Sequence, residues 1–402
     1  MRRSFRPDPQ DIGEILMTTQ AEAIRAPQVG PATHQWMSWL LVVVLIYLLL
    51  AAVGAIGDGF KSATGDNARE LFAFATNPLV GLMIGMVATA LIQSSSTVSS
   101  IIVGMVAGGL PVSIAVPLIM GANIGTSLTS TIVSLGHVRN GQEFRRAFSA
   151  ATVHDSFNIL AVLILLPLEV LFQPLQIGAQ AIAGFFVSDA SVDMKSANFM
   201  KVLLSPASDL LSASVGWLPG KLWSGIALIV IGIAMILFVV SAVGKVLRKV
   251  MVGRAQEIMH ASVGRGPISG MASGTAITVL VQSSSTTTSL IVPLAGTGVF
   301  SLKQVYPFTL GTNIGTCITA LLAATAITGP TAELAMQIAM VHLLFNLLGI
   351  AIIYGLPFLR VLPPRMAEGL ATLAQRNKLY VVAYMAGLFF VLPLAMIGIS
   401  QI

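Results

Sequence analysis

The sequence predicts an all-α polytopic membrane protein built from two inverted-topology repeats, each with a re-entrant helical hairpin and broken helices. Of the 402 residues, 55% are hydrophobic and only 9% are charged, whereas a soluble domain carries about 25% charged residues. Uncharged stretches run for 68 residues between Glu70 and Arg139 and for 37 residues between Arg265 and Lys303. Three polar blocks also recur in the same order. Each of the two uncharged stretches is long enough to require several membrane passes or re-entrant segments.

Two segments, 37–56 and 222–244, are apolar and long enough to cross a bilayer as single helices. The cations near the amino terminus precede a 20-residue apolar segment, which is too long for the core of a cleavable signal, so we expect a cytosolic tail over 1–35 and a retained first helix. The net charge of +6 comes from short loops beside apolar segments, which the positive-inside rule explains without nucleic acid. The single cysteine, Cys317, excludes an internal disulfide.

The internal repeat divides the chain. Gln-Ser-Ser-Ser-Thr begins at Gln93 and again 189 positions later at Gln282, Gly-x-Asn-Ile-Gly-Thr begins at 121 and 311, and a block from His to Asn spans 154–158 and 342–346. Blocks that keep their order and nearly their spacing define two copies of one unit. We predict a first transmembrane repeat over 36–187, an extracellular or periplasmic linker over 188–221, a second transmembrane repeat over 222–365, and a cytosolic connector with a last transmembrane helix over 366–402.

Charges orient the two copies. With the amino terminus in the cytosol, the first helix leads outward and copy one starts outside at 57–70. Copy two follows segment 245–265, which carries five Lys or Arg and one Glu and is therefore expected in the cytosol. The copies then start on opposite sides, and secondary transporters with inverted repeats bind substrate near the bilayer midplane. The last apolar segment, 379–399, is expected to place the carboxyl terminus outside.

Each copy also contains candidate helix breaks. The Gly-rich segments 106–113 and 294–301 predict hairpin turns, and Pro117, Pro293 and Pro307 predict further interruptions. Free backbone groups at membrane depth are tolerated where they line a cavity, and there a helix amino terminus favours an anion. The alternative is that the serines and glycines only allow helices to pack closely.

The polar blocks combine hydroxyls and amides, which suit an oxyanion together with a hard cation. Neither copy has a Lys or Arg inside its apolar blocks except Lys303, at a predicted hairpin end. We therefore expect no fixed cation at the site. An anion buried there would need positive charge, and bound sodium ions would supply it, which makes anion and sodium binding mutually dependent.

Asp155 is the one charged residue between Arg146 and Glu169. Placing it inside a membrane costs about 3 kcal/mol, so a partner is expected. That partner is either sodium or, for a structural carboxylate, backbone or His154. For His154 and His342, a hydrogen bond to a neighbouring helix and a proton relay are both open. Asn123 and Asn313 are either cation ligands or anchors of the hairpins.

These motifs resemble those of the type II sodium-phosphate cotransporters. The resemblance covers about 71–169 and 266–365 and rests on the two QSSST blocks, PLIMGANIGTS, FRRAF at 144–148, ATVHDSFN with LPLE after it, and GTNIGT. It implies phosphate import driven by sodium, with no cofactor besides sodium as the coupling ion, in a compact form of the bacterial inner membrane. The short linker departs from animal members, which carry a long cysteine-containing loop there. By position, the implied phosphate ligands are Gln93, Ser94, Ser95, Ser96, Gln282, Ser283, Ser284 and Ser285.

By the same resemblance, Asp155 matches the acid of electrogenic family members, which implies that transport moves net positive charge. The candidate sodium ligands are Ser95, Thr97, Asn123, Thr126, Asp155, Asn158, Ser284, Asn313, Thr316 and Asn346. Two other functions are weighed against symport. A passive anion channel would show no sodium dependence. An intramembrane serine hydrolase would use Ser95 and His154, but it would not need two copies of the serine block.

Overall fold

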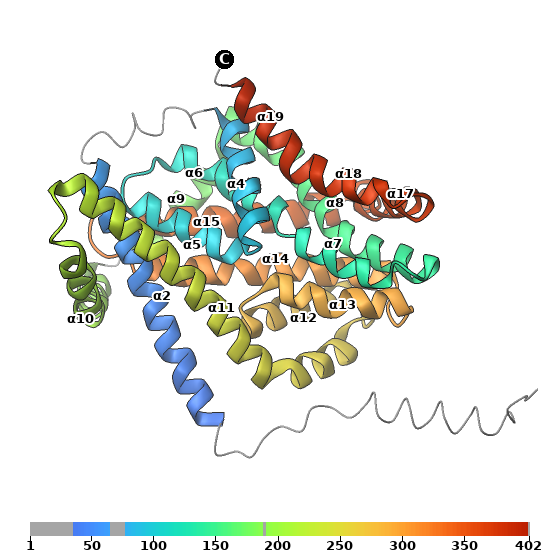
Figure 1. Ribbon diagram of the computed structural model, residues 1–402, viewed down its shortest axis with the longest axis horizontal. Helices are drawn as coiled ribbons and strands as arrows, with labels where there is room; N and C mark the ends of the chain where they lie inside the picture. Colours follow the sequence, from blue (N-terminus) through green and yellow to red (C-terminus); the bar gives the residue numbers. More distant parts are fainter. Residues whose placement is uncertain (1–34, 65–76, 188–189, 401–402) are drawn as a thin grey trace, which may run out of the picture.

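The computed structural model describes residues 35–64, 77–187 and 190–400, and within these residues it contains helices and no strand (Figure 1). Seven helical segments are long and apolar enough to cross a membrane: Trp36–Ala63, Val112–His137, Gly141–Phe172, Gly220–Leu247, Leu302–Thr325, Ala332–Tyr354 and Leu379–Ile399. They include the three crossing segments predicted above. The prediction of an all-α, multi-pass membrane protein is confirmed, whereas residues 1–34 of the predicted tail lie outside the described part.

Helices α2 (Gln35–Thr64) and α11 (Gly220–Ser262) open the two copies and lie along each other (Figure 1). A Cβ added at Gly59 would lie 2.8 Å from the carbonyl oxygen of Gly225, and one added at Gly232 would lie 2.6 Å from Cγ1 of Ile56. Position 59 therefore meets 225 while 56 meets 232, so the two helices run antiparallel. This is the arrangement expected of corresponding helices in copies of opposite orientation.

Within each copy, two parallel helices touch through their backbones. In copy one, α4 (Pro78–Ile92) packs on α6 (Val112–Gly125), and in copy two, α12 (Pro267–Val281) packs on α14 (Leu302–Thr325). A Cβ added at Gly121 would lie 1.9 Å from the carbonyl oxygen of Leu82, and one added at Gly311 would lie 1.9 Å from that of Met271. Only glycine permits this approach, and both copies use it at corresponding positions.

The Gly-rich turns occur where predicted. Four residues separate the end of α5 (Ser95–Ala107) from the start of α6 at Val112, and four separate the end of α13 (Ser284–Thr297) from the start of α14 at Leu302. Lys303 is exposed in the first turn of α14, at the hairpin end. The prediction that prolines interrupt the helices is wrong, since α6, α13 and α14 continue through Pro117, Pro293 and Pro307. Packing against neighbouring helices allows a membrane helix to tolerate the missing hydrogen bond.

The remaining helices surround these pairs. Copy one continues through α7 (Leu128–Ser134), η4 (Leu135–His137), α8 (Gly141–Phe172) and α9 (Pro174–Val187), and α15 (Ala332–Gly349) with its π-helical extension η5 (Ile350–Tyr354) follows α14. Helix α10 (Ala190–Val215) fills most of the predicted linker and lies beside α2 (Figure 1). The chain ends with α16 (Pro357–Arg360), α17 (Leu362–Arg376), which packs on α8, and α18 (Leu379–Ala386), η6 (Gly387–Val391) and α19 (Leu392–Ile399).

Candidate functional site

The two Gln-Ser-Ser-Ser motifs are helix breaks of the same geometry. Gln93 ends α4 with a left-handed φ of 56°, and Gln282 ends α12 with a φ of 53°. Positive φ is uncommon for residues other than glycine. After each glutamine, a serine in extended conformation starts the next helix, α5 or α13. The motifs therefore redirect the chain at an exposed Gln93 and at a half-buried Gln282.

The serine after each glutamine caps the helix that follows. Ser94 Oγ accepts a hydrogen bond from Thr97 N at 3.2 Å, and Ser283 Oγ accepts one from Thr286 N at 3.2 Å. Such a cap satisfies one amide of the first turn, while the amides before it have no acceptor within the helix. Because these amides and the helix dipole favour negative charge, each motif presents a potential anion-binding end.

The two breaks meet at one cavity. Ser285 Oγ donates to the backbone oxygen of Gln93 at 3.4 Å, and the hydroxyls of Ser130 and Thr288 lie 2.6 Å apart, so both contacts cross between the copies. The cavity has a volume of about 550 Å³, and no Asp or Glu lies among the described residues that line it. Its polar lining consists of Gln93, Ser94, Thr97, Thr129, Ser241, Lys245, Ser283, Ser285, Thr286 and Ser289.

The expectation of a site without a fixed cation is wrong, because Lys245 lines this cavity. The residue directly follows the apolar segment 222–244, and α11 continues past it to Ser262. The sequence argument considered only charges inside the duplicated blocks. Helix α11 lies outside those blocks, and its continuation places the lysine beside the serines.

Several implied phosphate ligands do not line the cavity. Ser95, Ser96 and Ser284 are buried in the first turns of α5 and α13. The Gln282 amide donates to the oxygen of Val279 at 2.8 Å and accepts from Thr319 Oγ1 at 3.0 Å. Copy two therefore holds the Gln282 side chain within itself, whereas Gln93 reaches the cavity.

Besides Thr129, which lines the cavity, three buried hydroxyls near the breaks have no hydrogen-bond partner among the described residues. They belong to Ser95 and to Thr89 and Thr278, which stand four positions before the two glutamines. Buried polar groups nearly always have a partner, and those without one often mark a place for an ion or water. Thr89 and Thr278 were not among the predicted ligands, although their equal distance from the motifs was visible in the sequence.

A network of buried amides links the copies below these breaks. Asn123 on α6 donates through Nδ2 to Asn346 Oδ1 at 2.7 Å, and its Oδ1 lies 3.2 Å from His342 Nε2. Both partners belong to α15, in the other copy. Asn158 Nδ2 also donates to the backbone oxygen of Asn123 at 2.8 Å. Asn123 is thereby fixed from three sides.

The second copy repeats this arrangement. Asn313 on α14 donates through Nδ2 to Asn158 Oδ1 at 2.8 Å, and its Oδ1 contacts His154 Nε2. Each histidine is thus bonded to an asparagine on a helix of the other copy, the structural alternative considered for both. The four asparagines predicted as sodium ligands form one of the contacts between the repeats.

Asp155 is fully buried and held by two hydroxyls. Tyr384 donates to Oδ2 at 2.7 Å, and Ser127 donates to Oδ1. Sequence reasoning missed both partners. Ser127 directly follows the predicted ligand Thr126, but Tyr384 lies on α18, where no motif points to it.

Two of the three predicted threonine ligands bond to the backbone of their own helices, whereas the third, Thr97, donates to Ser94 Oγ at 2.9 Å and lines the cavity. Thr126 Oγ1 donates to the oxygen of Ala122 at 3.1 Å, and Thr316 Oγ1 donates to that of Thr312 at 2.9 Å. Over the described residues, no group of three or more His, Cys, Asp or Glu is placed to hold a metal ion.

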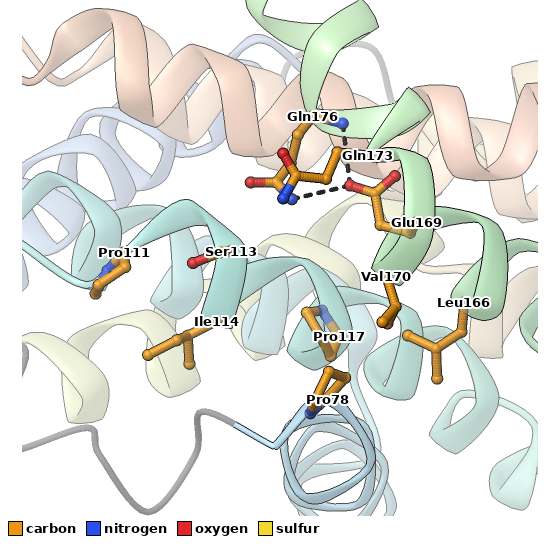
Figure 2. Close-up of a pocket in the computed structure, with 10 residues that line it drawn as sticks. All are labelled: Pro78, Pro111, Ser113, Ile114, Pro117, Leu166, Glu169, Val170, Gln173 and Gln176. Atoms are coloured by element: carbon orange, nitrogen blue, oxygen red, sulfur yellow. Dashed lines mark hydrogen bonds between the residues drawn. The ribbon is translucent and has the colours of Figure 1, made fainter.

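A second hollow, of about 400 Å³, lies beside Glu169 and the start of α9 (Figure 2). The buried Glu169 carboxylate accepts hydrogen bonds from Leu175 N at 2.7 Å, Gln176 N at 3.2 Å and Gln176 Nε2 at 3.0 Å. These donors belong to the first turn of α9, so the glutamate of the LPLE segment caps that helix. The hollow contains no serine of either duplicated motif, and its carboxylate already has three donors.

The chain is similar to known phosphate transport proteins. It is 32% identical to sodium-dependent phosphate transport protein 2B of Pongo abelii and of Homo sapiens over 450 residues, with 90% of this chain and 65% of each relative covered. It is 34% identical to protein 2A of Rattus norvegicus over 436 residues, with 90% of this chain and 67% of that protein covered. The chain therefore spans about 65% of the length of the 2B relatives. No solved structure matches the chain.

The sequence profile of one family, described as Na+/Pi-cotransporter, matches residues 48–188 and 235–361. The two matched segments include both Gln-Ser-Ser-Ser motifs, both asparagine blocks and both histidine blocks, and together they exceed half of the chain. The resemblance inferred from the motifs is confirmed, and the chain belongs to the Na+/Pi-cotransporter family.

Proposed function

We propose that the chain is a sodium-coupled symporter that imports inorganic phosphate by alternating access, with phosphate bound between the two Gln-Ser-Ser-Ser motifs. The main support for this proposal is that the two motifs converge on one cavity. The cavity is lined by hydroxyls, and no acid lies among its described lining residues. Two helix amino termini also begin there, and such ends favour oxyanions. The names of the relatives support the choice of phosphate and sodium.

Sodium binding is proposed near Asp155. The carboxylate is buried, and its described side-chain partners are neutral hydroxyls. A buried carboxylate without a cation is costly, and carboxylate and hydroxyl oxygens are ligands that hard cations prefer. Asp155 therefore supports electrogenic transport, in which sodium brings more positive charge than phosphate removes.

A serine hydrolase fits the geometry poorly. Ser95 Oγ has no hydrogen-bond partner among the described residues, and His154 Nε2 is engaged with Asn313. A nucleophilic serine needs a base within hydrogen-bonding reach, and this pair does not provide one. A passive anion channel would use the same hydroxyls, so a transport assay is needed to distinguish a channel from a symporter.

The test is uptake of radioactive phosphate into proteoliposomes with and without an inward sodium gradient. We expect accumulation above the equilibrium level only with sodium, and equal uptake under both conditions would refute sodium coupling. Ser94→Ala and Ser283→Ala should each impair uptake, because each removes a cavity hydroxyl and a helix cap. Ser212→Ala on the exposed surface of α10 is the control and should transport normally.

Asp155→Gly should leave phosphate uptake while removing most of the current that accompanies it. The reason is that a neutral residue no longer attracts the extra sodium ion. Current and radioactive phosphate are measured together in voltage-clamped membranes. An unchanged current per phosphate would show that Asp155 does not bind the charge-carrying ion.

For the topology we propose a bacterial inner-membrane protein with its amino terminus in the cytosol and its carboxyl terminus outside. The cations of segment 245–265 support this orientation. The described part has seven crossing candidates, and an odd number puts the two ends on opposite sides if the shorter apolar helices re-enter. Alkaline phosphatase fused after Ile402 should be active in cells. An inactive phosphatase fusion, together with fluorescence from a cytosolic reporter protein fused at the same position, would show that the orientation is the opposite one.

A further inference from the structure

Lys245 is the one charged residue among those that line the cavity between the Gln-Ser-Ser-Ser motifs in the described structure. Its side chain is exposed, and no described carboxylate lies within ion-pairing distance of it. The rest of the polar lining is neutral. An exposed ammonium group at a cavity rich in hydroxyls is suited to bind an oxyanion.

The duplicated architecture gives this lysine no counterpart. With the offset of 189 positions between the two glutamines, position 245 corresponds to Ile56, which is buried. The serine caps, asparagines and glycines recur in both copies, but the cation occurs in one. It lies where the apolar segment 222–244 of α11 ends and where Arg248, Lys249 and Arg254 follow in the sequence, the side that the positive-inside rule places in the cytosol.

We propose that Lys245 is the fixed cation of the anion site and binds the phosphate oxyanion from the cytosolic side. The inference rests on the proposed function, and it names a ligand outside the duplicated motifs. Hydroxyls and helix amides would hold phosphate from the two breaks, while Lys245 supplies charge at the opening next to α11. Sodium then does not have to neutralise the anion alone.

The first test measures equilibrium binding of radioactive phosphate to the purified full-length protein, with sodium present. Lys245→Gln should weaken binding by about tenfold or more, the loss expected of a charge-assisted hydrogen bond, and Lys245→Arg should retain most of the affinity. Lys221→Gln, at the start of α11, is the matched control and should bind as the wild type does. Normal folding of each variant is checked by its elution and melting temperature.

The second test uses Lys245→Cys. The chain has a single natural cysteine, Cys317, which is buried, so the introduced thiol is the accessible one. A membrane-impermeant thiosulfonate should label it in inside-out vesicles and not in intact cells, and phosphate with sodium should slow labelling several-fold. A reagent that attaches an aminoethyl group should restore phosphate affinity, whereas a neutral reagent of similar size should not.

The outcomes separate the two proposals. Wild-type protein without sodium-dependent phosphate binding would overturn the proposed function and this inference with it. Wild-type binding combined with unchanged binding by Lys245→Gln would overturn the role of Lys245 alone. Labelling of Lys245→Cys that phosphate does not slow, or equal rescue by the neutral reagent, would assign the lysine a structural role instead.

Discussion

The close contact between α4 and α6 predicts that adding a single methyl group at Gly121 will lower the stability of the protein. In Gly121→Ala, the new Cβ would lie 1.9 Å from Leu82 O and 2.9 Å from Met86 N. Ordinary contact begins at about 3.4 Å, so the helices must separate by about 1.5 Å, and backbone atoms cannot rotate away as a side chain can. A gap of even 1 Å forfeits up to about half of the dispersion energy of the facing atoms.

Overpacking a core typically costs about 1–3 kcal/mol, and a clash between two backbones belongs at the upper end. Alanine regains about 1 kcal/mol of helix propensity over glycine, which leaves a net loss of about 2 kcal/mol. For a chain of 402 residues, whose unfolding entropy grows with length, this corresponds to a fall of about 2 °C in melting temperature. Because α4 carries Gln93 at its end, phosphate uptake should also fall.

Melting in detergent, followed by size-exclusion elution, measures this loss. Gly311→Ala, the same change in copy two, should lower the melting temperature as much, because its Cβ would lie 1.9 Å from Met271 O. Gly54→Ala on α2 is the control, since a Cβ there would meet nothing within 4 Å. Wild-type stability of Gly121→Ala, or an equal fall in Gly54→Ala, would refute the proposed backbone contact.

Two further predictions concern the buried polar groups. Asn123→Ala leaves Asn346 Oδ1 and His342 Nε2 without a partner, although Asn346 Nδ2 still donates to His342 O. The loss should cost about 2–6 kcal/mol, at about 1–3 kcal/mol for each unpaired group. Adding Asn346→Ala should then cost less than it does alone, and additive losses in melting experiments would contradict the coupling. Tyr384→Phe keeps the ring next to Phe148 but removes a donor to Asp155, so the half-saturating sodium concentration for uptake should fall a few-fold, and an unchanged sodium curve would disconnect Asp155 from sodium.

The sequence was sufficient to locate the breaks and the polar blocks. Duplication showed which residues correspond: Gln93 with Gln282, and Asn123 with Asn313. Composition and hydropathy identified the crossing segments, because the apolar residues of each crossing helix lie in one continuous stretch of sequence. The left-handed conformation of the two glutamines was not predictable, because glutamine has no preference for positive φ.

Residues brought to the site by tertiary packing could not be found in this way. Tyr384 reaches Asp155 from α18, 229 positions away, and Lys245 reaches the cavity because α11 continues beyond its apolar segment. Neither belongs to a repeated block. Their roles depend on the register of whole helices against one another, which local patterns leave undetermined.

The two charges near the site interrupt the symmetry that the neutral ligands keep. Ser94 corresponds to Ser283 and Asn123 to Asn313, whereas Asp155 corresponds to Leu343 and Lys245 to Ile56. If the two copies exchange conformations during transport, paired neutral ligands present equivalent contacts in both states, and the unpaired charges make the states electrically different. Variants of the paired serines should therefore weaken phosphate binding from both sides of the membrane. Variants of Asp155 and Lys245 should change the current and the affinity on one side.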